Sequence, residues 1–284
     1  MTNFIQNYGS TILEYVWIPI IVPILALLGK YIVFDRLLYV KEIKKLDDAS
    51  VEDFIDIYNE RIADHLKICV DEILQYIGHS KKDSVDHHLY VCKKLNKTVG
   101  FIKFMVSKEY KYIFIAYVAI DNNDKTAVRH GLKTMCRKLT KKHFKPQIAT
   151  CIITEVDKST DGGYITALSR IVARYAKILG KESYYVDIPY IQPQMPDDEK
   201  HMKNDDFLSL LYIPYYSREN NRISKSELMQ IIESIYFDIY GPSCNPDAGC
   251  DCDAYNMYLE SLLELYRTDT EDYVRLFPLR KERT

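Results

Sequence analysis

The stretch that decides the fold is LYVCKKLNKTVGFIKFMV (89–106), followed by YIFIAYVAID (112–121), NNDKTAVRHG (122–131) and LKTMCRKL (132–139). β-Branched and aromatic residues around the turn signal LNKTVG predict strands over 89–93, 99–106 and 112–120. The last piece is apolar at every third or fourth position and predicts a helix over 126–143. A strand that leads through a polar loop into a helix presents free backbone N–H groups, which are a common phosphate-binding site.

The sequence on either side continues to alternate between helix and strand patterns. Further helices are predicted over 51–78, 164–180, 223–240 and 255–266, and further strands over 148–156, 183–193 and 207–216. This alternation predicts an α/β fold with a mixed (α+β) sheet covered by helices. The predicted organisation is an anchor over 1–40, a charged linker over 41–50, a main α/β domain over 51–220 and a helical extension over 221–284.

An uncharged run near the start, YVWIPIIVPILALLG (15–29), continues through Lys30 to Phe34. About 20 apolar residues suffice to cross a bilayer, so residues 12–34 are predicted to form a single transmembrane helix. A buried helix or a docking segment is the alternative. Basic residues follow the run, at Lys30, Arg36, Lys41, Lys44 and Lys45. The positive-inside rule therefore predicts a single-pass protein of the inner or plasma membrane with its catalytic domain in the cytoplasm.

Composition narrows the class of protein. Hydrophobic residues make up 47% of the 284 residues, which is enough for a full core, and the net charge of -2 gives no case for nucleic-acid binding. The seven cysteines do not resemble a secreted disulfide framework. Cys244, Cys250 and Cys252 could contribute to a zinc site, but a tight turn is the preferred interpretation, and no metal is expected.

Several phrases resemble the GNAT N-acetyltransferase superfamily. They are HLYVCKKLNKTVGFIKFMV around Gly100, YVAID (117–121), ARYAKILG (173–180), YIQPQM and LLYIPYY. The resemblance covers about residues 50–218 and implies a GNAT-like acyl-CoA N-acyltransferase fold, in which a helical pair precedes an antiparallel strand set. It further implies that the fourth strand, here 112–120, leads into a helix whose N-terminus binds the pyrophosphate of acyl-CoA.

The resemblance also implies a cofactor site. In the family, the fourth and fifth strands diverge and expose a backbone N–H that polarises the thioester carbonyl. The loop that follows holds the pyrophosphate, although Thr126 stands here where the family has Gln or Arg, and Arg129 stands where it has Gly. The cofactor-binding residues expected on this basis are Val118, Ala119, Ile120, Lys125, Thr126, Ala127, Val128, Arg129, His130 and Gly131.

Two catalytic roles have candidate side chains. The resemblance implies that Tyr175, on the late helix, protonates the leaving thiolate. A carboxylate at the end of the fifth strand could accept the amine proton, which nominates Glu155 and then Asp157. The leading hypothesis is a membrane-tethered acyltransferase that moves an acyl group, expected to be acetyl, from acetyl-CoA or another acyl-CoA to a small-molecule or protein amine.

Two other hypotheses remain open. A GNAT-fold binding or sensor module without catalysis would explain the departures in the loop, since fold alone does not give function. An acyltransferase that uses a carrier-protein thioester would need fewer phosphate contacts. The helical tail from Ile223 is expected either to cover the sheet or to form a homodimer, and the sequence does not distinguish the two.

Overall fold

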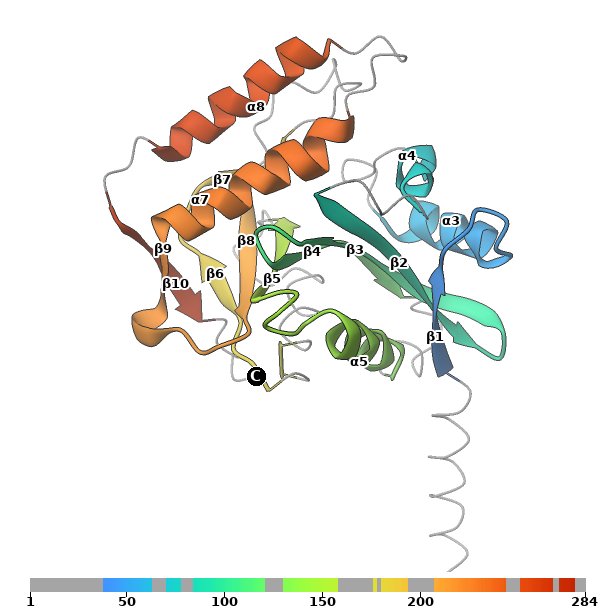
Figure 1. The fold of residues 1–284 in the computed structure, drawn as a ribbon. Coiled ribbons are helices and arrows are strands. Elements are labelled where there is room, and N and C mark those ends of the chain that lie inside the picture. The colour runs from blue at the N-terminus through green and yellow to red at the C-terminus, as the bar shows by residue number, and fades with distance from the viewer. Residues whose placement is uncertain are drawn as a thin grey trace, which may run out of the picture.

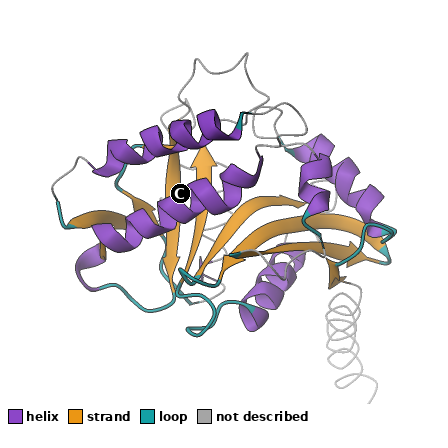
Figure 2. Ribbon diagram, turned by 45° about the horizontal axis from the view of Figure 1, so that its top comes forward, coloured by secondary structure: helices purple, strands orange, loops and turns teal. Residues whose placement is uncertain are grey.

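The computed structural model describes residues 38–62, 70–77, 84–120, 130–157, 176–177, 180–193, 207–243, 251–267 and 271–278. These residues form a mixed α/β fold in which helices cover both faces of one long sheet (Figures 1 and 2). The predicted fold class is therefore confirmed at this level.

The sheet follows the order β1-β2-β3-β4-β5-β8-β6-β10-β9, and β7 pairs with β8. Its strands are β1 (Leu38–Ile43), β2 (Val85–Lys94), β3 (Lys97–Ser107), β4 (Tyr112–Ile120), β5 (Cys151–Asp157), β6 (Tyr184–Val186), β7 (Tyr190–Ile191), β8 (Phe207–Pro214), β9 (Arg222–Ser224) and β10 (Tyr273–Pro278). All the paired strands are antiparallel except β4 and β5, which are parallel. The sheet is therefore mixed because of that one pair.

The described helices are α3 (Ser50–Arg61), α4 (Val70–Gln75), α5 (Leu132–Lys142), α7 (Lys225–Ser234) and α8 (Cys252–Arg267). Helix α7 continues as a π-helical turn (Ile235–Tyr240) and a 3-10 turn (Gly241–Ser243). A separate 3-10 turn (Glu219–Asn221) precedes β9. Helices α3, α4, α7 and α8 cover one face of the sheet, and α5 covers the other (Figure 1).

Alternation along the strands divides the core between these two faces, because successive side chains of a strand point to opposite sides. On β3, Phe101 packs in a cluster with α3, and Met105 packs in a cluster with α7 and α8. The intervening Ile102 and Phe104 face α5. The helical spacing of α5 supplies Leu132, Met135, Cys136 and Leu139 to that second face, all of them buried.

The sequence predicted most elements near their observed positions. The strand expected over 112–120 is β4 with the same bounds, and the helices expected over 223–240 and 255–266 are present. The single strand expected over 183–193 is wrong, because β6 and β7 are separated by a bend. Most of the helix expected over 164–180 lies outside the described residues.

Three strands were not predicted: β1, β9, which lies at the start of the helix expected over 223–240, and β10. β1 pairs with β2 along its whole length and crosses the boundary expected at residue 40 between anchor and linker. β10 pairs with both β6 and β9, so the C-terminal segment contributes strands as well as helices. The segment expected to span the membrane, residues 12–34, lies outside the described residues. Among the helices that are described, none is long and apolar enough to cross a membrane.

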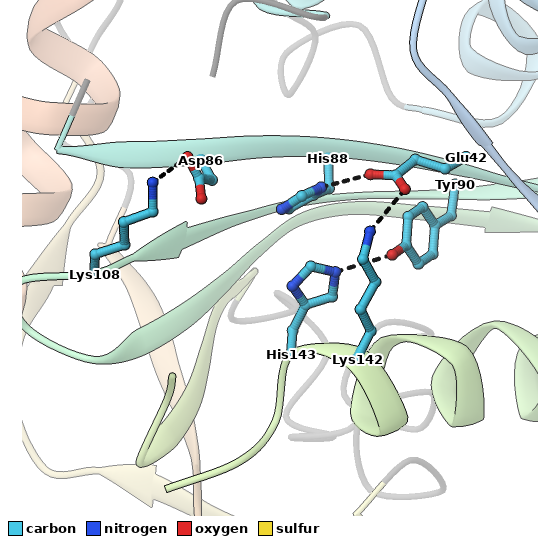
Figure 3. Close-up of polar contacts among 7 residues, drawn as sticks. All are labelled: Glu42, Asp86, His88, Tyr90, Lys108, Lys142 and His143. Atoms are coloured by element: carbon cyan, nitrogen blue, oxygen red, sulfur yellow. Dashed lines mark hydrogen bonds and ion pairs between the residues drawn. The ribbon is translucent and has the colours of Figure 1, made fainter. Parts of the chain in front are cut away.

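A polar cluster ties β1 to the C-terminal end of α5 (Figure 3). Glu42 on β1 accepts a hydrogen bond from Lys142 Nζ at 2.9 Å and lies 2.8 Å from His88 Nδ1. Burial would raise the pKa of Glu42, but these two partners outweigh it and lower the pKa to about 2. Beside them, Tyr90 Oη lies 2.9 Å from His143 Nε2. The cluster therefore fixes an edge strand against both the sheet and α5.

Candidate active site

The site begins where β4 and β5 separate. The two parallel strands pair only over Tyr112–Phe114 and Cys151–Ile153. In the described part of the chain no further pair joins them, although β4 continues to Ile120 and β5 to Asp157. At the point of separation, Thr154 Oγ1 donates a hydrogen bond to the backbone oxygen of Ile115 at 2.7 Å. The two strands therefore diverge, as the sequence resemblance implies for the fourth and fifth strands.

A β-bulge changes the direction of β4 at this point. The pairing with β3 passes from Phe104 opposite Ile115 to Lys103 opposite Tyr117, so Ala116 is an extra residue on β4. Bulges bend a strand and redirect its side chains. Ala116 packs with the α7–α8 cluster and Tyr117 with the α3–α4 cluster, so both side chains lie on the same face of the sheet.

Gly100 allows the end of β4 to lie close to β3. A Cβ atom at this position would lie 2.7 Å from the backbone oxygen of Ala119 and 3.2 Å from Ile120 Cα. Both neighbours are backbone atoms, so a larger residue could be accommodated only if β4 moved. Gly100 therefore fixes the position of the backbone segment expected to hold the thioester.

Glu155 lies on β5 beyond the point of separation. Tyr190 on β7 donates a hydrogen bond to Glu155 Oε1, and Tyr240 on the π-helical turn donates to Oε2 at 2.6 Å. Gln192 Nε2 donates to the phenol oxygen of Tyr240 at 2.9 Å. Each carboxylate oxygen can accept more than one hydrogen bond, so Glu155 keeps capacity for a further donor.

The surroundings of Glu155 change its acidity. Burial raises its pKa to about 7, although the hydrogen bonds from Tyr190 and Tyr240 oppose the rise. Burial and the charge of Glu155 raise the pKa of both tyrosines well above the ordinary value, so both remain protonated donors. A carboxyl group with a pKa close to neutral can both accept and release a proton under physiological conditions.

The predicted cofactor residues fall into three groups. Val118, Ala119 and Ile120 form the end of β4, and the carbonyl of Ala119 is the one closest to Gly100. Within the described residues, the β5-facing edge of this segment has no strand paired to it. The second group, Lys125, Thr126, Ala127, Val128 and Arg129, lies outside the described residues.

The third group, His130 and Gly131, precedes α5 directly. The carbonyl of His130 accepts a hydrogen bond from Thr134 Oγ1 at 2.9 Å. A Cβ atom at Gly131 would lie 3.1 Å from Cys92 Sγ, so the start of α5 lies close to β2. Ile120 and Leu132 belong to the same apolar cluster. The end of β4 and the start of α5 therefore share one part of the core.

The remaining candidates are distributed as follows. Tyr175 lies outside the described residues, as do Cys244 and Cys250. Asp157 ends β5, and Cys252 is the first residue of α8. Within the part of the chain that the structure describes, no group of three His, Cys, Asp or Glu side chains is arranged to hold a metal ion.

Tyr190 and Tyr240 were not identified from the sequence. Both lie in apolar segments among 24 tyrosines, and nothing in their local pattern distinguishes them. The abundance of tyrosine was the only feature of the sequence that hinted at a role for such side chains. Their importance depends on contacts across 35 and 85 residues of chain, which local periodicity does not report.

Comparison with known proteins gives matches among solved structures only. No family model and no curated protein sequence matches this chain. A GNAT-family acetyltransferase from Bacteroides thetaiotaomicron is 12% identical, with a TM-score of 0.49, covering 71% of this chain and 98% of its own. Diaminobutyrate acetyltransferase from Paenibacillus lautus, in complex with L-2,4-diaminobutyric acid and coenzyme A, is 16% identical, with a TM-score of 0.42 and coverage of 63% and 97%.

An N-acetyltransferase from Campylobacter jejuni, in complex with acetyl coenzyme A, is 13% identical, with a TM-score of 0.36 and coverage of 63% and 100%. Each of these three solved structures is described as an acetyltransferase.

Proposed function

We propose that this protein is a GNAT-type N-acyltransferase that moves an acyl group, expected to be acetyl, from acyl-CoA to an amine acceptor. The observation that supports the proposal most is the separation of β4 from β5 next to Glu155. The separation leaves one backbone edge of β4 available to the thioester. The carboxyl group of Glu155, with a pKa of about 7, lies in the same region of the sheet.

The chemistry follows from these two features. An acceptor ammonium gives one proton to Glu155, and the nitrogen lone pair then attacks the thioester carbonyl carbon. The C–N bond forms, the C–S bond breaks, and the second proton lost by the nitrogen balances the proton that the thiolate gains. Backbone N–H groups near Val118 to Ile120 would stabilise the negative charge on the carbonyl oxygen. Tyr175 is the proposed donor to the thiolate.

The first test is calorimetric titration of acetyl-CoA into the full chain and into Arg129→Glu. Arg137→Glu is the matched control, because it reverses the same charge at an exposed position of α5. The proposal expects micromolar binding that weakens in Arg129→Glu and not in Arg137→Glu. Absence of binding at millimolar acetyl-CoA by the folded protein would reject an enzyme that uses acyl-CoA.

The acceptor and the location are further parts of the proposal. The proposed acceptor is a small-molecule or protein amine, and a thiol-release assay over amines of both kinds would identify it. We propose that residues 12–34 tether the domain to the membrane with the catalytic domain in the cytoplasm. The apolar run and the basic residues that follow it support this topology. Fractionation and protease protection of the full chain would test it.

The second candidate function is a GNAT-fold binding or sensor module without catalysis. Thr126 and Arg129 favour it, because they replace residue types that the resemblance expects in the pyrophosphate loop. A folded protein that ignores acetyl-CoA would support this second candidate. A protein that ignores acetyl-CoA but accepts an acyl group from an acylated carrier protein would instead support the carrier-protein donor.

A further inference from the structure

Among the described residues of the C-terminal segment, Tyr240 is the one that hydrogen-bonds to Glu155. The residues that end α7 continue as a π-helical turn, closed by a hydrogen bond from Gly241 N–H to the carbonyl of Tyr236. A π-helical turn closes i→i+5 hydrogen bonds, so it aims the next side chain differently from an α-helical continuation, and such turns are frequent at functional sites. Here the turn ends at Tyr240, which is 5% exposed.

The direction of the Tyr240 hydroxyl proton is set by its neighbours. Gln192 Nε2 is a donor and lies 2.9 Å from the phenol oxygen, so Tyr240 accepts from Gln192. The hydroxyl proton is then directed to Glu155 Oε2, 2.6 Å away. An ionised carboxylate only accepts hydrogen bonds, so in this arrangement Tyr240 is the donor to Glu155.

A second layer of hydrogen bonds holds the π-helical turn in place. Tyr236 Oη donates to the carbonyl of Ile191 at 2.6 Å, and Ile191 N–H donates to Tyr266 Oη at 2.8 Å. These bonds connect the turn and α8 to β7, which also carries Tyr190. The position of Tyr240 is therefore determined by three separate elements and not by its own rotamer alone.

We propose that Tyr240 is a positioning residue for Glu155, and that the C-terminal segment thereby completes the catalytic site. The catalytic meaning of this inference rests on the proposed acyltransferase function. In this arrangement Tyr190 occupies one lone pair of Oε1 and Tyr240 occupies one lone pair of Oε2, so the two hydrogen bonds fix the orientation of the carboxylate. The remaining lone pairs stay available to the acceptor amine. The C-terminal segment then contributes a residue to the catalytic site.

In the part of the chain that the structure describes, the titratable groups around the Glu155 carboxyl group are phenols. The titratable side chains that interact with Glu155 directly, or with Tyr240 beside it, come from β4, β7, the π-helical turn and α8: Tyr117, Tyr190, Tyr236, Tyr240 and Tyr266. Of these, Tyr190 and Tyr240 donate to the carboxylate. Loss of either donor removes stabilisation of the ionised carboxylate and shifts its titration to higher pH.

The test is a carbon-13 NMR titration of the Glu155 carboxyl group in the full chain without ligand, assigned with Glu155→Gln. Tyr240→Phe removes one hydroxyl and keeps the ring. We expect the midpoint to rise by about one pH unit, which corresponds to the loss of one hydrogen bond to a charged group. Tyr212→Phe is the matched control, because Tyr212 is a buried tyrosine that accepts its hydrogen bonds from Arg218, away from Glu155.

Gln192→Ala is a second variant in case Tyr240→Phe fails to fold. It removes the donor behind Tyr240 without touching Glu155, and a smaller rise of the midpoint is expected. An unchanged midpoint in a folded Tyr240→Phe protein would overturn the inference. So would a rise of the same size in Tyr212→Phe.

Acyl transfer is measured separately, so that the two proposals fail independently. With an acceptor in hand, Tyr240→Phe is expected to lower kcat and shift the acid limb of the pH profile upward, with an unchanged Kd for acetyl-CoA. A wild-type protein that does not bind acetyl-CoA would reject the enzyme. The NMR midpoint would still decide whether Tyr240 positions Glu155.

Discussion

Gly100→Ala is the substitution that most directly tests the geometry of the proposed site. The added Cβ atom would lie 2.7 Å from the carbonyl oxygen of Ala119, whereas ordinary contacts begin at 3.4 Å. The end of β4 must therefore move by roughly 0.7 Å, because no flexible side chain can yield. Overpacking of this kind costs about 1–3 kcal/mol of unfolding free energy.

The same movement affects the site. Val118, Ala119 and Ile120 are the residues expected to hold the thioester, and displacements near 1 Å can cost about 100-fold in rate. We expect weaker acetyl-CoA binding and a lower kcat/KM than for the wild type. Urea unfolding followed by circular dichroism measures the stability, and calorimetry measures the Kd for acetyl-CoA.

Gly180→Ala is the matched control for stability. Gly180 has a φ of +64°, and a Cβ atom added there would meet no other atom within 4 Å, so alanine costs only backbone strain of about 1–2 kcal/mol. This variant should lose stability and keep its acetyl-CoA affinity. A Gly100→Ala protein with wild-type stability and wild-type Kd would refute the reasoning about β4.

Three further predictions follow from the polar contacts. Glu155→Gln should lower kcat about 10²–10⁴-fold with an unchanged Kd for acetyl-CoA. It should also abolish the rise of rate with pH through about 7, and a retained rise would contradict the assignment. Burial raises the pKa of Glu155 on folding, so its contribution to the free energy of unfolding is complete below about pH 4.5 and is lost as the pH rises through about 7. Urea unfolding midpoints of the wild type and of Glu155→Gln, measured at pH 5 and at pH 8, check this. Glu42→Gln should cost about 1.5–3 kcal/mol at pH 7. Because the pKa of Glu42 is lowered, this loss of unfolding free energy should fade as the pH falls from about 4.5 to about 2. Asp86→Asn is the control: it breaks an exposed ion pair with Lys108 and should cost below about 1 kcal/mol. Thr154→Val removes the hydrogen bond to Ile115 and should cost about 1 kcal/mol in a thermal or urea unfolding experiment; no loss would show that the bond does not stabilise the strand separation.

Some of the candidate site could be predicted from the sequence. Glu155 follows an apolar strand pattern, and a carboxylate in that position is unusual enough to be nominated. The segment over 112–120 is a continuous run of apolar and aromatic residues that ends at a polar loop, so its position as a strand that leads into a helix was predictable. Its role with acyl-CoA came from the resemblance and stays a proposal.

Other features could not be predicted because they depend on distant partners. β1 is a strand because it pairs with β2 some 50 residues away. Its six residues lie across the boundary between the predicted anchor and the predicted charged linker, and neither prediction included a strand. β10 is short and largely exposed, and it is a strand because β6 and β9 are available to it. Neither segment has a strong periodic pattern of its own.

The sequence by itself determined the order of most helices and strands and the carboxylate at the end of β5, because hydrophobic periodicity is a local property of the chain. Only the tertiary structure decided where β4 and β5 separate, since that depends on Thr154, the bulge at Ala116 and the partners β3 and β8. The raised pKa of Glu155 was also decided there. It arises from burial, which outweighs the opposing hydrogen bonds from two phenols, and both the burial and these contacts form only when the C-terminal segment packs on the sheet.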